Sequence, residues 1–334
     1  MNSQTLETVW KEQARWSEVA NQLKAAIVRA RSAALALGIL GAFLATLAAQ
    51  VAPPGATKSS ATKINNVAAA TNAVPAGQNA KIASSGSGLV RVLSGISVVA
   101  LGAAAALAAR SGSKQVQNWI RARSVSEALK QEAFLFMTRA KPYADNSPET
   151  TLSLHMKDIL DKAKDLSVLA ATITPRPREI PKIDSPQDYV QQRVTGQIEQ
   201  FYLPKAQRLG KRLKLFQGAA ATLTTAAAVL SGAAGFFQAE WIGSWVAVAT
   251  TISAALVAHA AAARYQTDVI SYFSTANQLT SLRDQFLDAQ KRNAADATTY
   301  DRFVRQCEEV ISIENQGWMA NWQKPTDPPP PAGS

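Results

Sequence analysis

The sequence predicts an all-α membrane protein whose four transmembrane helices form two hairpins, each continuing into long cytoplasmic helices. Four long stretches of the 334-residue chain carry no charged residue: 32–57, 92–109, 215–239 and 241–263. A helix needs about 20 apolar residues to cross a bilayer of roughly 30 Å, and three of the stretches reach that length. The second is just short, and Leu89 and Val90 extend it if Arg91 reaches toward the headgroups.

A soluble helical bundle is the alternative, because the same stretches are rich in alanine. A soluble helix normally has one apolar stripe and one charged face. These stretches have no charge on any face for about five turns or more. Only a very large core would bury four such helices, so we favour the membrane interpretation.

The first half, residues 1–143, is expected to hold spans at about 33–52 and 89–109. Apolar residues recur every three or four positions from Gln4 to Ala30, which predicts an amphipathic helix that continues into the first span as one rod. The stretch 53–87 is rich in Ala, Ser, Asn and Gly, and we expect a flexible loop outside the cell. After the second span, the helix is expected to carry on to about Thr138.

Residues 144–188 are expected to link the halves. Ser147 and Ser185 each precede a proline, which is typical of a helix start. The linker is predicted to contain a short helix over 152–169 and an extended proline-rich stretch over 174–186.

The second half is expected over residues 189–323. Its predicted elements are a leading helix over 189–214, spans at about 217–238 and 242–263, and closing helices over 264–289 and 298–322. The proline-rich tail, 324–334, is expected to be disordered.

The two halves share one order of elements (helix, span, loop, span, helix), which predicts an internal repeat. The aligned residues are Trp16 with Tyr202, Ala20 with Ala206, Ile27 with Leu213, Ile120 with Ile270, Ser124 with Ser274, Leu129 with Leu279, and Phe136 with Phe286.

The net charge of the whole chain is +11. Much of this excess comes from basic residues that gather at one end of every span. They are Lys24, Arg29, Arg31, Arg110, Lys114, Arg121, Arg123, Lys205, Arg208, Lys211, Arg212, Lys214 and Arg264. An excess of Lys and Arg marks cytoplasmic flanks, so both termini and the middle segment are expected in the cytoplasm. Because the charges flank the spans, we expect them to face anionic lipid, and we expect no nucleic-acid partner.

The helix after the second span carries a pattern of aromatic and charged residues: Trp119-Ile120-Arg121-Ala122-Arg123-Ser124, then Glu127, Leu129, Lys130, Glu132, Phe136 and Tyr143. This pattern resembles the post-hairpin helix of prokaryotic SLATT proteins, two-transmembrane domains associated with nucleotide-signalling conflict systems. The second half is similar to another SLATT subtype through Tyr202, Lys205, and the segment from Cys307-Glu308-Glu309-Val310 to Glu314 and Trp318. The resemblance covers nearly the whole chain as a tandem pair.

The resemblance implies a membrane effector in the bacterial inner membrane that oligomerises to form or perturb a pore. Its trigger would be a nucleotide second messenger made or sensed by a partner protein. The alternative is a non-conducting scaffold that binds partners through its cytoplasmic helices.

No catalytic constellation is evident, so we expect no enzyme activity, cofactor or metal. His155 and His259 have no Cys, Asp or Glu at ligand spacing. The single cysteine, Cys307, excludes an intrachain disulfide and is expected to be a buried apolar residue.

Candidate functional residues fall into three groups. Those in the spans, which line a wet path or bond to neighbouring helices, are Thr222, Thr224, Thr225, Ser231, Thr250, Thr251, Ser253 and His259. The cytoplasmic candidates for regulation or partner binding are Trp119, Arg121, Arg123, Glu127, Glu132, Glu314 and Trp318. Trp241 and Trp245 are expected to anchor the outer interface.

The two arginines of the cytoplasmic group have several possible partners. Arg121 and Arg123 could receive an anionic ligand or a partner's acids, contact lipid, or form salt bridges with Glu127 and Glu132 on their own helix.

Overall fold

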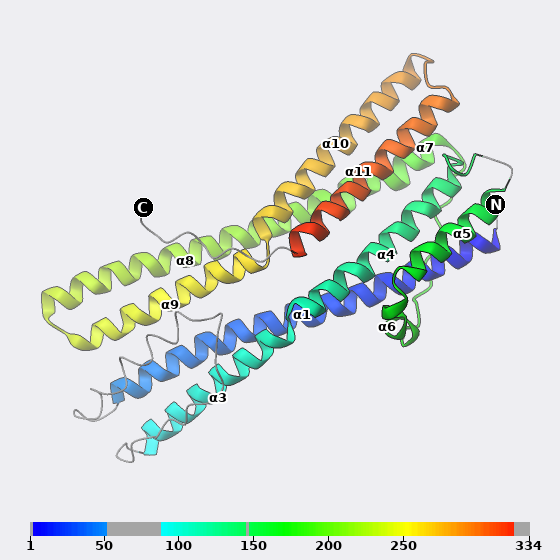
Figure 1. The fold of residues 1–334 in the computed structure, drawn as a ribbon. Coiled ribbons are helices and arrows are strands. Elements are labelled where there is room, and N and C mark those ends of the chain that lie inside the picture. Colours follow the sequence, from blue (N-terminus) through cyan, green and yellow to red (C-terminus); the bar gives the residue numbers. More distant parts are fainter. Residues whose placement is uncertain (1–2, 52–87, 145–146, 324–334) are drawn as a thin grey trace. The chain divides into compact units, whose positions relative to one another are not determined.

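The computed structural model describes residues 3–51, 88–144 and 147–323, with the side chains at 240 and 314–323 left out. All regular elements in these ranges are helices (Figure 1). Four of the helices are long and apolar enough to cross a membrane, which confirms the predicted fold class. The expected outer loop (53–87) and the proline-rich tail (324–334) fall outside the described residues.

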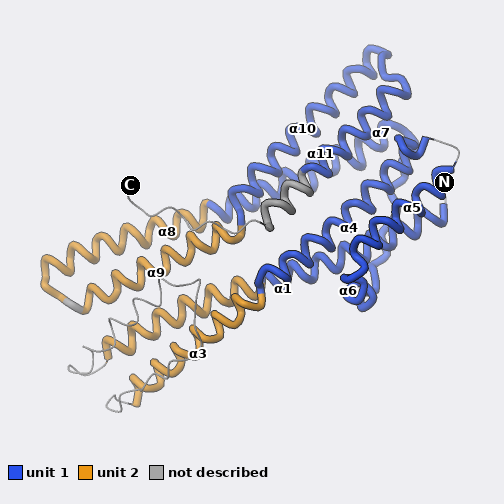
Figure 2. Tube along the Cα trace, viewed as in Figure 1, with its two compact units in different colours: residues 1–28, 111–213, 264–327 blue, residues 29–110, 214–263, 328–334 orange. Residues whose placement is uncertain are grey.

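The chain forms two compact units that cut across the sequence repeat (Figure 2). Unit 1 comprises residues 1–28, 111–213 and 264–327, and unit 2 comprises residues 29–110, 214–263 and 328–334. Each unit takes segments from both halves of the sequence. The apolar spans therefore gather in unit 2, and the polar helices gather in unit 1.

The first hairpin is built from α1 (Gln4–Val51) and α3 (Gly88–Arg110). As predicted, the amphipathic helix and the first span form one continuous rod in α1. The two helices approach closely at Gly41, where the Ser97 hydroxyl donates to the Gly41 carbonyl over 2.8 Å. The helix of the second span was predicted to continue without a break, and this is wrong. Ser111 and Gly112 separate α3 from the next helix, α4 (Ser113–Met137).

The second hairpin is built from α8 (Leu203–Phe237) and α9 (Glu240–Ala262). A short helix, α7 (Pro186–Asp188), and two π-helical segments, η2 (Tyr189–Thr195) and η3 (Gln197–Tyr202), lead into α8. The leading helix was predicted, whereas its π character was not. After α9, Arg264 adopts a left-handed conformation with φ of 53°, and α10 (Tyr265–Lys291) begins at the next residue. The last helix is α11 (Ala297–Gln323).

The linker helix predicted over 152–169 is divided into three pieces. They are α5 (Pro148–Asp161), the 3-10 turn η1 (Lys164–Leu166) and α6 (Ser167–Ala171). Ser185 caps α7 through its side chain, as its sequence context indicates, and accepts from the Asp188 amide. Ser147 stands at the N-cap of α5 but makes no side-chain cap bond.

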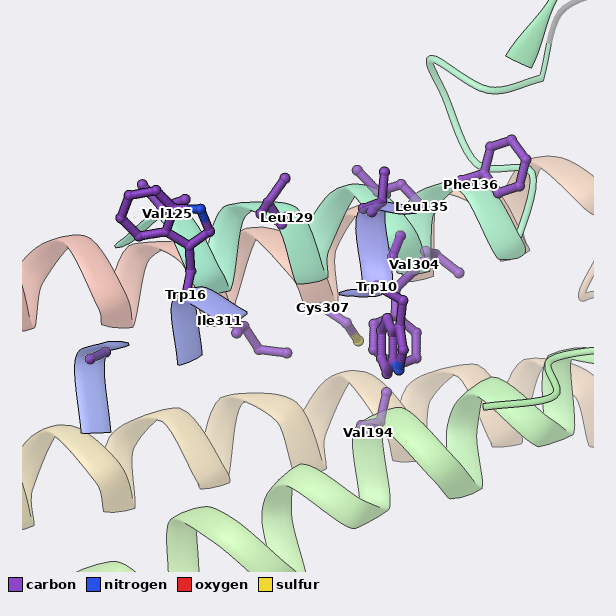
Figure 3. Close-up of a cluster of buried hydrophobic side chains, with 14 of the residues drawn as sticks. Trp10, Trp16, Val125, Leu129, Leu135, Phe136, Val194, Val304, Cys307 and Ile311 are labelled. Atoms are coloured by element: carbon purple, nitrogen blue, oxygen red, sulfur yellow. The ribbon is translucent and has the colours of Figure 1, made fainter. Parts of the chain in front are cut away.

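Unit 1 holds the hydrophobic core, which α1, α4, η2, η3, α10 and α11 share. Figure 3 shows Trp10 and Trp16 of α1 beside Leu129 of α4 and Cys307 of α11. Cys307 is fully buried among apolar side chains, as predicted. Tightly packed aromatic residues also join α10 to α11, where the Phe286 and Phe303 rings stack with centroids 4.3 Å apart.

The aligned halves match in burial at most of the positions compared. The matching pairs, all buried, are Trp16 with Tyr202, Ala20 with Ala206, Leu129 with Leu279, and Phe136 with Phe286. The match fails at Ile120, which is 1% exposed whereas its counterpart Ile270 is 63% exposed. It also fails at Ile27 and Ser124, whose counterparts Leu213 and Ser274 are each more exposed. The first half therefore buries a helix face that the second half leaves open.

We predict that Gly41→Val destabilises the first hairpin while Gly38→Val does not. A Cβ at Gly41 would lie 2.7 Å from Leu101 Cγ, whereas a Cβ at Gly38 meets no atom within 4 Å. Both changes have the same effect on helix propensity, so the difference between the two unfolding midpoints reports the contact between α1 and α3 at Gly41. The thermal unfolding midpoint of the detergent-solubilised protein should fall for Gly41→Val alone, and equal midpoints would contradict the close approach.

Candidate functional site

The central feature of unit 1 is an ion pair between Arg193 of η2 and Glu308 of α11. Both side chains are 1% exposed. The guanidinium donates from Nε to one carboxylate oxygen over 2.8 Å and from Nη2 to the other over 2.7 Å. This planar, two-bond geometry is the strong form of the arginine–carboxylate interaction.

Aromatic side chains complete the surroundings of the pair. The Tyr189 hydroxyl donates to Glu308 over 3.0 Å, and the Arg193 guanidinium lies 4.3 Å from the centroid of the Phe134 ring. Burial disfavours the charge on Arg193, but Glu308 outweighs that effect and raises the pKa of Arg193 above its usual value. Burial, reinforced by Glu308, raises the pKa of Tyr189 well above its usual value. The hydroxyl therefore stays a donor at physiological pH.

A second group of charges lies beside the pair on α4. Burial, together with the positive charge of Arg193, lowers the pKa of Lys130 to about 8. Burial alone would raise the pKa of Glu127, but the cations around it, Arg123 first, hold it below its usual value. Arg123 Nη2 lies 3.9 Å from the Glu127 carboxylate, as its helical spacing indicates.

The other candidates outside the spans have different partners from those expected. Arg121 donates two bonds of 2.6 Å to Asp165 of η1, which lies in the linker. Glu132 pairs with neither arginine and instead contacts His155 over 3.0 Å and the Tyr143 hydroxyl. Glu132 lies 23 residues before His155, and the packing of α5 on α4 brings the two side chains together. Trp119 is buried, with Lys24 Nζ 5.2 Å from its ring centroid.

Glu314 and Trp318 lie in α11, but their side chains are outside the described residues. Within the ranges that the structure describes, no group of three or more His, Cys, Asp or Glu side chains is placed to hold a metal ion.

The hydroxyl residues of the spans divide into packed and exposed ones. Ser253 of α9 bonds to Thr224 of α8 over 2.9 Å and donates to the Ala220 carbonyl over 3.0 Å, so this pair joins the two helices. The hydroxyls that donate to a carbonyl of their own helix one turn earlier are Thr222, Thr224, Thr250 and Thr251. Thr225 and Ser231 are exposed on α8.

The remaining candidates in the spans are residues with ring side chains, one histidine and two tryptophans. His259 packs on Phe216 with centroids 5.2 Å apart, and Trp245 packs on Phe43 with centroids 5.6 Å apart. Trp241 is 60% exposed at the start of α9. Its role as an interface anchor stays a prediction.

Residues 189–318 match the family described as SMODS and SLOG-associating 2TM effector domain 1, or SLATT_1. The second half of the chain is therefore similar to a SLATT domain. Residues 13–151 match a family described as a protein of unknown function, DUF4231, which is a related two-transmembrane family. No curated protein and no solved structure matches the chain. The two matched regions follow one another along the chain, and the first matches a related family and not a second SLATT subtype.

The region that matches SLATT_1 supplies both members of the buried ion pair, and the region that matches DUF4231 supplies the Phe134 ring that covers it. Sequence reasoning missed Arg193 altogether and used Glu308 only as part of a pattern. One signal could have found the arginine, since Val190, Val194 and Ile198 place it on the apolar face of its helix. Nothing in the sequence identifies its partner 115 residues away.

We predict that Arg193→Met destabilises unit 1 by about 3–5 kcal/mol, because it leaves the Glu308 charge buried without its partner. The double variant with Glu308→Met should recover much of that loss, since no charge then remains. Arg121→Met is the matched control and should cost less than about 1 kcal/mol, because the Arg121–Asp165 pair is solvent-exposed. Thermal unfolding in detergent measures all three, and a double variant no more stable than Arg193→Met would contradict the buried pair.

We also predict a pH dependence for Lys130. Between about pH 8 and 10.5, the unfolded chain binds a proton at this lysine that the folded chain does not, so folding stability rises with pH. Relative to Lys130→Met, the wild type should gain on the order of 3 kcal/mol between pH 7 and pH 10.5. Unfolding midpoints of both proteins in low-salt buffer test this, and a constant difference across the range would refute it.

Proposed function

We propose that the chain is a membrane effector of a prokaryotic nucleotide-signalling conflict system, and that it oligomerises to form or perturb a pore. The SLATT effector domain over residues 189–318 is the observation that carries the proposal. A partner protein that makes or senses a nucleotide signal would supply the trigger. We place the protein in the bacterial inner membrane with both termini in the cytoplasm, because Lys and Arg gather at one end of every span.

The exposed surface of the spanning helices supports assembly. Only 11–17% of the most apolar window of each span is buried within the chain. Val99, Val229 and Phe236 are 70%, 67% and 83% exposed, so lipid or further copies of the chain must cover them. Four spans with so few internal contacts are well suited to pack against other copies.

The distribution of hydroxyls limits what a lumen would contain. Thr224 and Ser253 are used in packing α8 on α9, which leaves Thr222 and Thr225 on the exposed face of α8. A selective cation pore usually needs rings of acids or carbonyls, and no span has a central acid. We therefore propose a weakly selective path lined by hydroxyl and small apolar side chains from several chains.

A non-conducting scaffold is the second candidate. Exposed apolar side chains on the cytoplasmic linker helices favour it, because Leu154 of α5 and Val168 of α6 are 62% and 73% exposed. Such residues are suited to bind a partner protein. A scaffold would recruit that partner to the membrane without changing ion permeability.

We predict that induced expression of the wild type depolarises a bacterium and stops its growth, whereas Val248→Lys does neither. Val248 is a buried position of α9, and a lysine in the middle of a span costs roughly 2.5–3.5 kcal/mol or more. Leu154→Lys, which adds the same charge at an exposed site outside the spans, should keep the effect. A potential-sensitive dye and colony counts provide the readout.

Resistance to alkaline extraction shows which variants have inserted into the membrane. If the inserted wild type leaves potential and viability unchanged, also when it is produced together with its nucleotide-signalling partner, pore formation is contradicted and the scaffold is favoured.

A further inference from the structure

The four spans of unit 2 contact one another in a series, from α3 through α1 and α9 to α8 (Figures 1 and 2). Within each hairpin a serine makes the contact, as described above for Ser97 and Ser253. The helices at the two ends of the series are α3 and α8. Among the described residues of the spans, the most exposed large apolar side chains all lie on these two helices, and they include Val99, Val229 and Phe236.

The contact between the two hairpins is made by α1 and α9. Three interactions spread along the spans join them: Arg31 donates to the Ala262 carbonyl over 3.1 Å, the Phe43 and Trp245 ring centroids lie 5.6 Å apart, and Gln50 donates to the Trp241 carbonyl over 3.2 Å.

This contact joins the first helix of one hairpin to the second helix of the other, so it is heterologous. The hairpins share one order of elements and lie in regions that match related two-transmembrane families. By that order, α8 is the counterpart of α1, and α3 is the counterpart of α9. The chain therefore uses one pair of surfaces internally and carries the equivalent pair, on α8 and α3, at the two ends of the series.

The alignment of the halves identifies exposed residues of α8 as counterparts of the contacting residues of α1. Both α1 and α8 are unbroken through their spans, so the pairing of Trp16 with Tyr202 sets the register. It pairs Arg31 with Gln217, Phe43 with Val229, and Gln50 with Phe236. All three residues of α8 are exposed, and Gln217 keeps a side-chain donor like that of Arg31.

The surfaces of both end helices allow another helix to approach closely. On α3, a Cβ added at Gly95 or Gly102 would meet no described atom within 4 Å. Small residues and hydroxyls are the side chains by which helices pack within a bilayer. An open groove of about 680 Å³ lies beside α8, lined by Ala221, Thr222, Thr225, Ala226, Val229 and Leu230.

We propose that a second copy of the chain covers these surfaces, with α8 of one copy packed against α3 of the next as α1 packs against α9. This inference rests on the assembly proposed above and names the surfaces that make it. Basic residues precede the span of α8 and end α3, so the two helices lie antiparallel with both copies in one membrane orientation. Such a head-to-tail contact repeats from copy to copy and closes into a ring when the rotation allows.

The contact has two consequences for the assembly. Both surfaces belong to the spans, so the contact forms once the chains are inserted and precedes any signal. Thr222 and Thr225 then border the contact between copies, in agreement with a path lined by hydroxyls from several chains.

Site-specific photo-cross-linking of the full-length protein in bacterial membranes tests this contact. A benzophenone amino acid in place of Val229 reacts with neighbouring C–H bonds, so it needs no exact register. We expect a product of two chains whose cross-linked peptide maps to residues 88–110 of the other copy. The same probe in place of Val99 should reach residues 203–237.

The matched control is the same probe in place of Val257, an exposed residue of α9, because α9 already has a neighbouring helix on each side. It should give no product of two chains. Both test probes replace exposed valines, and only protein that resists alkaline extraction is analysed, so failed insertion cannot imitate a negative result.

Adducts with lipid alone at both Val229 and Val99 would overturn the proposal, since the bilayer then covers the two surfaces. A product that joins α8 to α8, or α3 to α3, would also overturn it, because it reports a two-fold contact. The membrane potential of the same cells separates this proposal from the proposed function. An α8–α3 product without depolarisation, with the signalling partner present, would support the interface and contradict the pore, whereas depolarisation without that product would overturn the interface alone.

Discussion

The buried pair of Arg193 and Glu308 is the interaction on which the packing of unit 1 depends. Taking both charges out of water costs several kcal/mol per ion, and only a partner in good geometry offsets that cost. The two parallel bonds, the Tyr189 hydroxyl and the Phe134 ring together supply it. Because a one-residue slip of either helix would leave two charges buried and unsatisfied, the pair determines how η2 and α11 align, and how α4 lies across them.

The backbone around the buried Arg193–Glu308 pair is π-helical, in segments η2 and η3. Tyr189, Arg193 and Gln197 follow one another at four-residue spacing, so they lie about one turn apart on a single face. That face meets Glu308 first and the α4 charges next, which forms a polar line through an otherwise apolar core. π-Helical turns are rare and are found mainly where a side chain must be directed to a functional or structural partner. Here they lie where charged side chains must enter the core.

The spans of unit 2 pack by a different principle, because lipid removes the hydrophobic driving force between helices. Small residues and hydroxyls make the contacts instead. Ser97 bonds to the Gly41 carbonyl in the first hairpin, and Ser253 bonds to the Ala220 carbonyl in the second. The hairpins also meet each other, since Arg31 donates to the Ala262 carbonyl over 3.1 Å. The large apolar side chains are left on the outside, where lipid takes the place of a core.

The sequence alone determined the four spans, the tandem order of helices and the burial of Cys307, because uncharged runs and three- to four-residue periodicity are local properties. It also carries the similarity of the second half to SLATT domains, which the match over residues 189–318 supports. The tertiary structure alone decided the partners: Glu308 for Arg193, Asp165 for Arg121 and His155 for Glu132. These contacts join residues far apart in the chain, and a charged residue in a helical pattern predicts a solvated face until packing places its partner beside it.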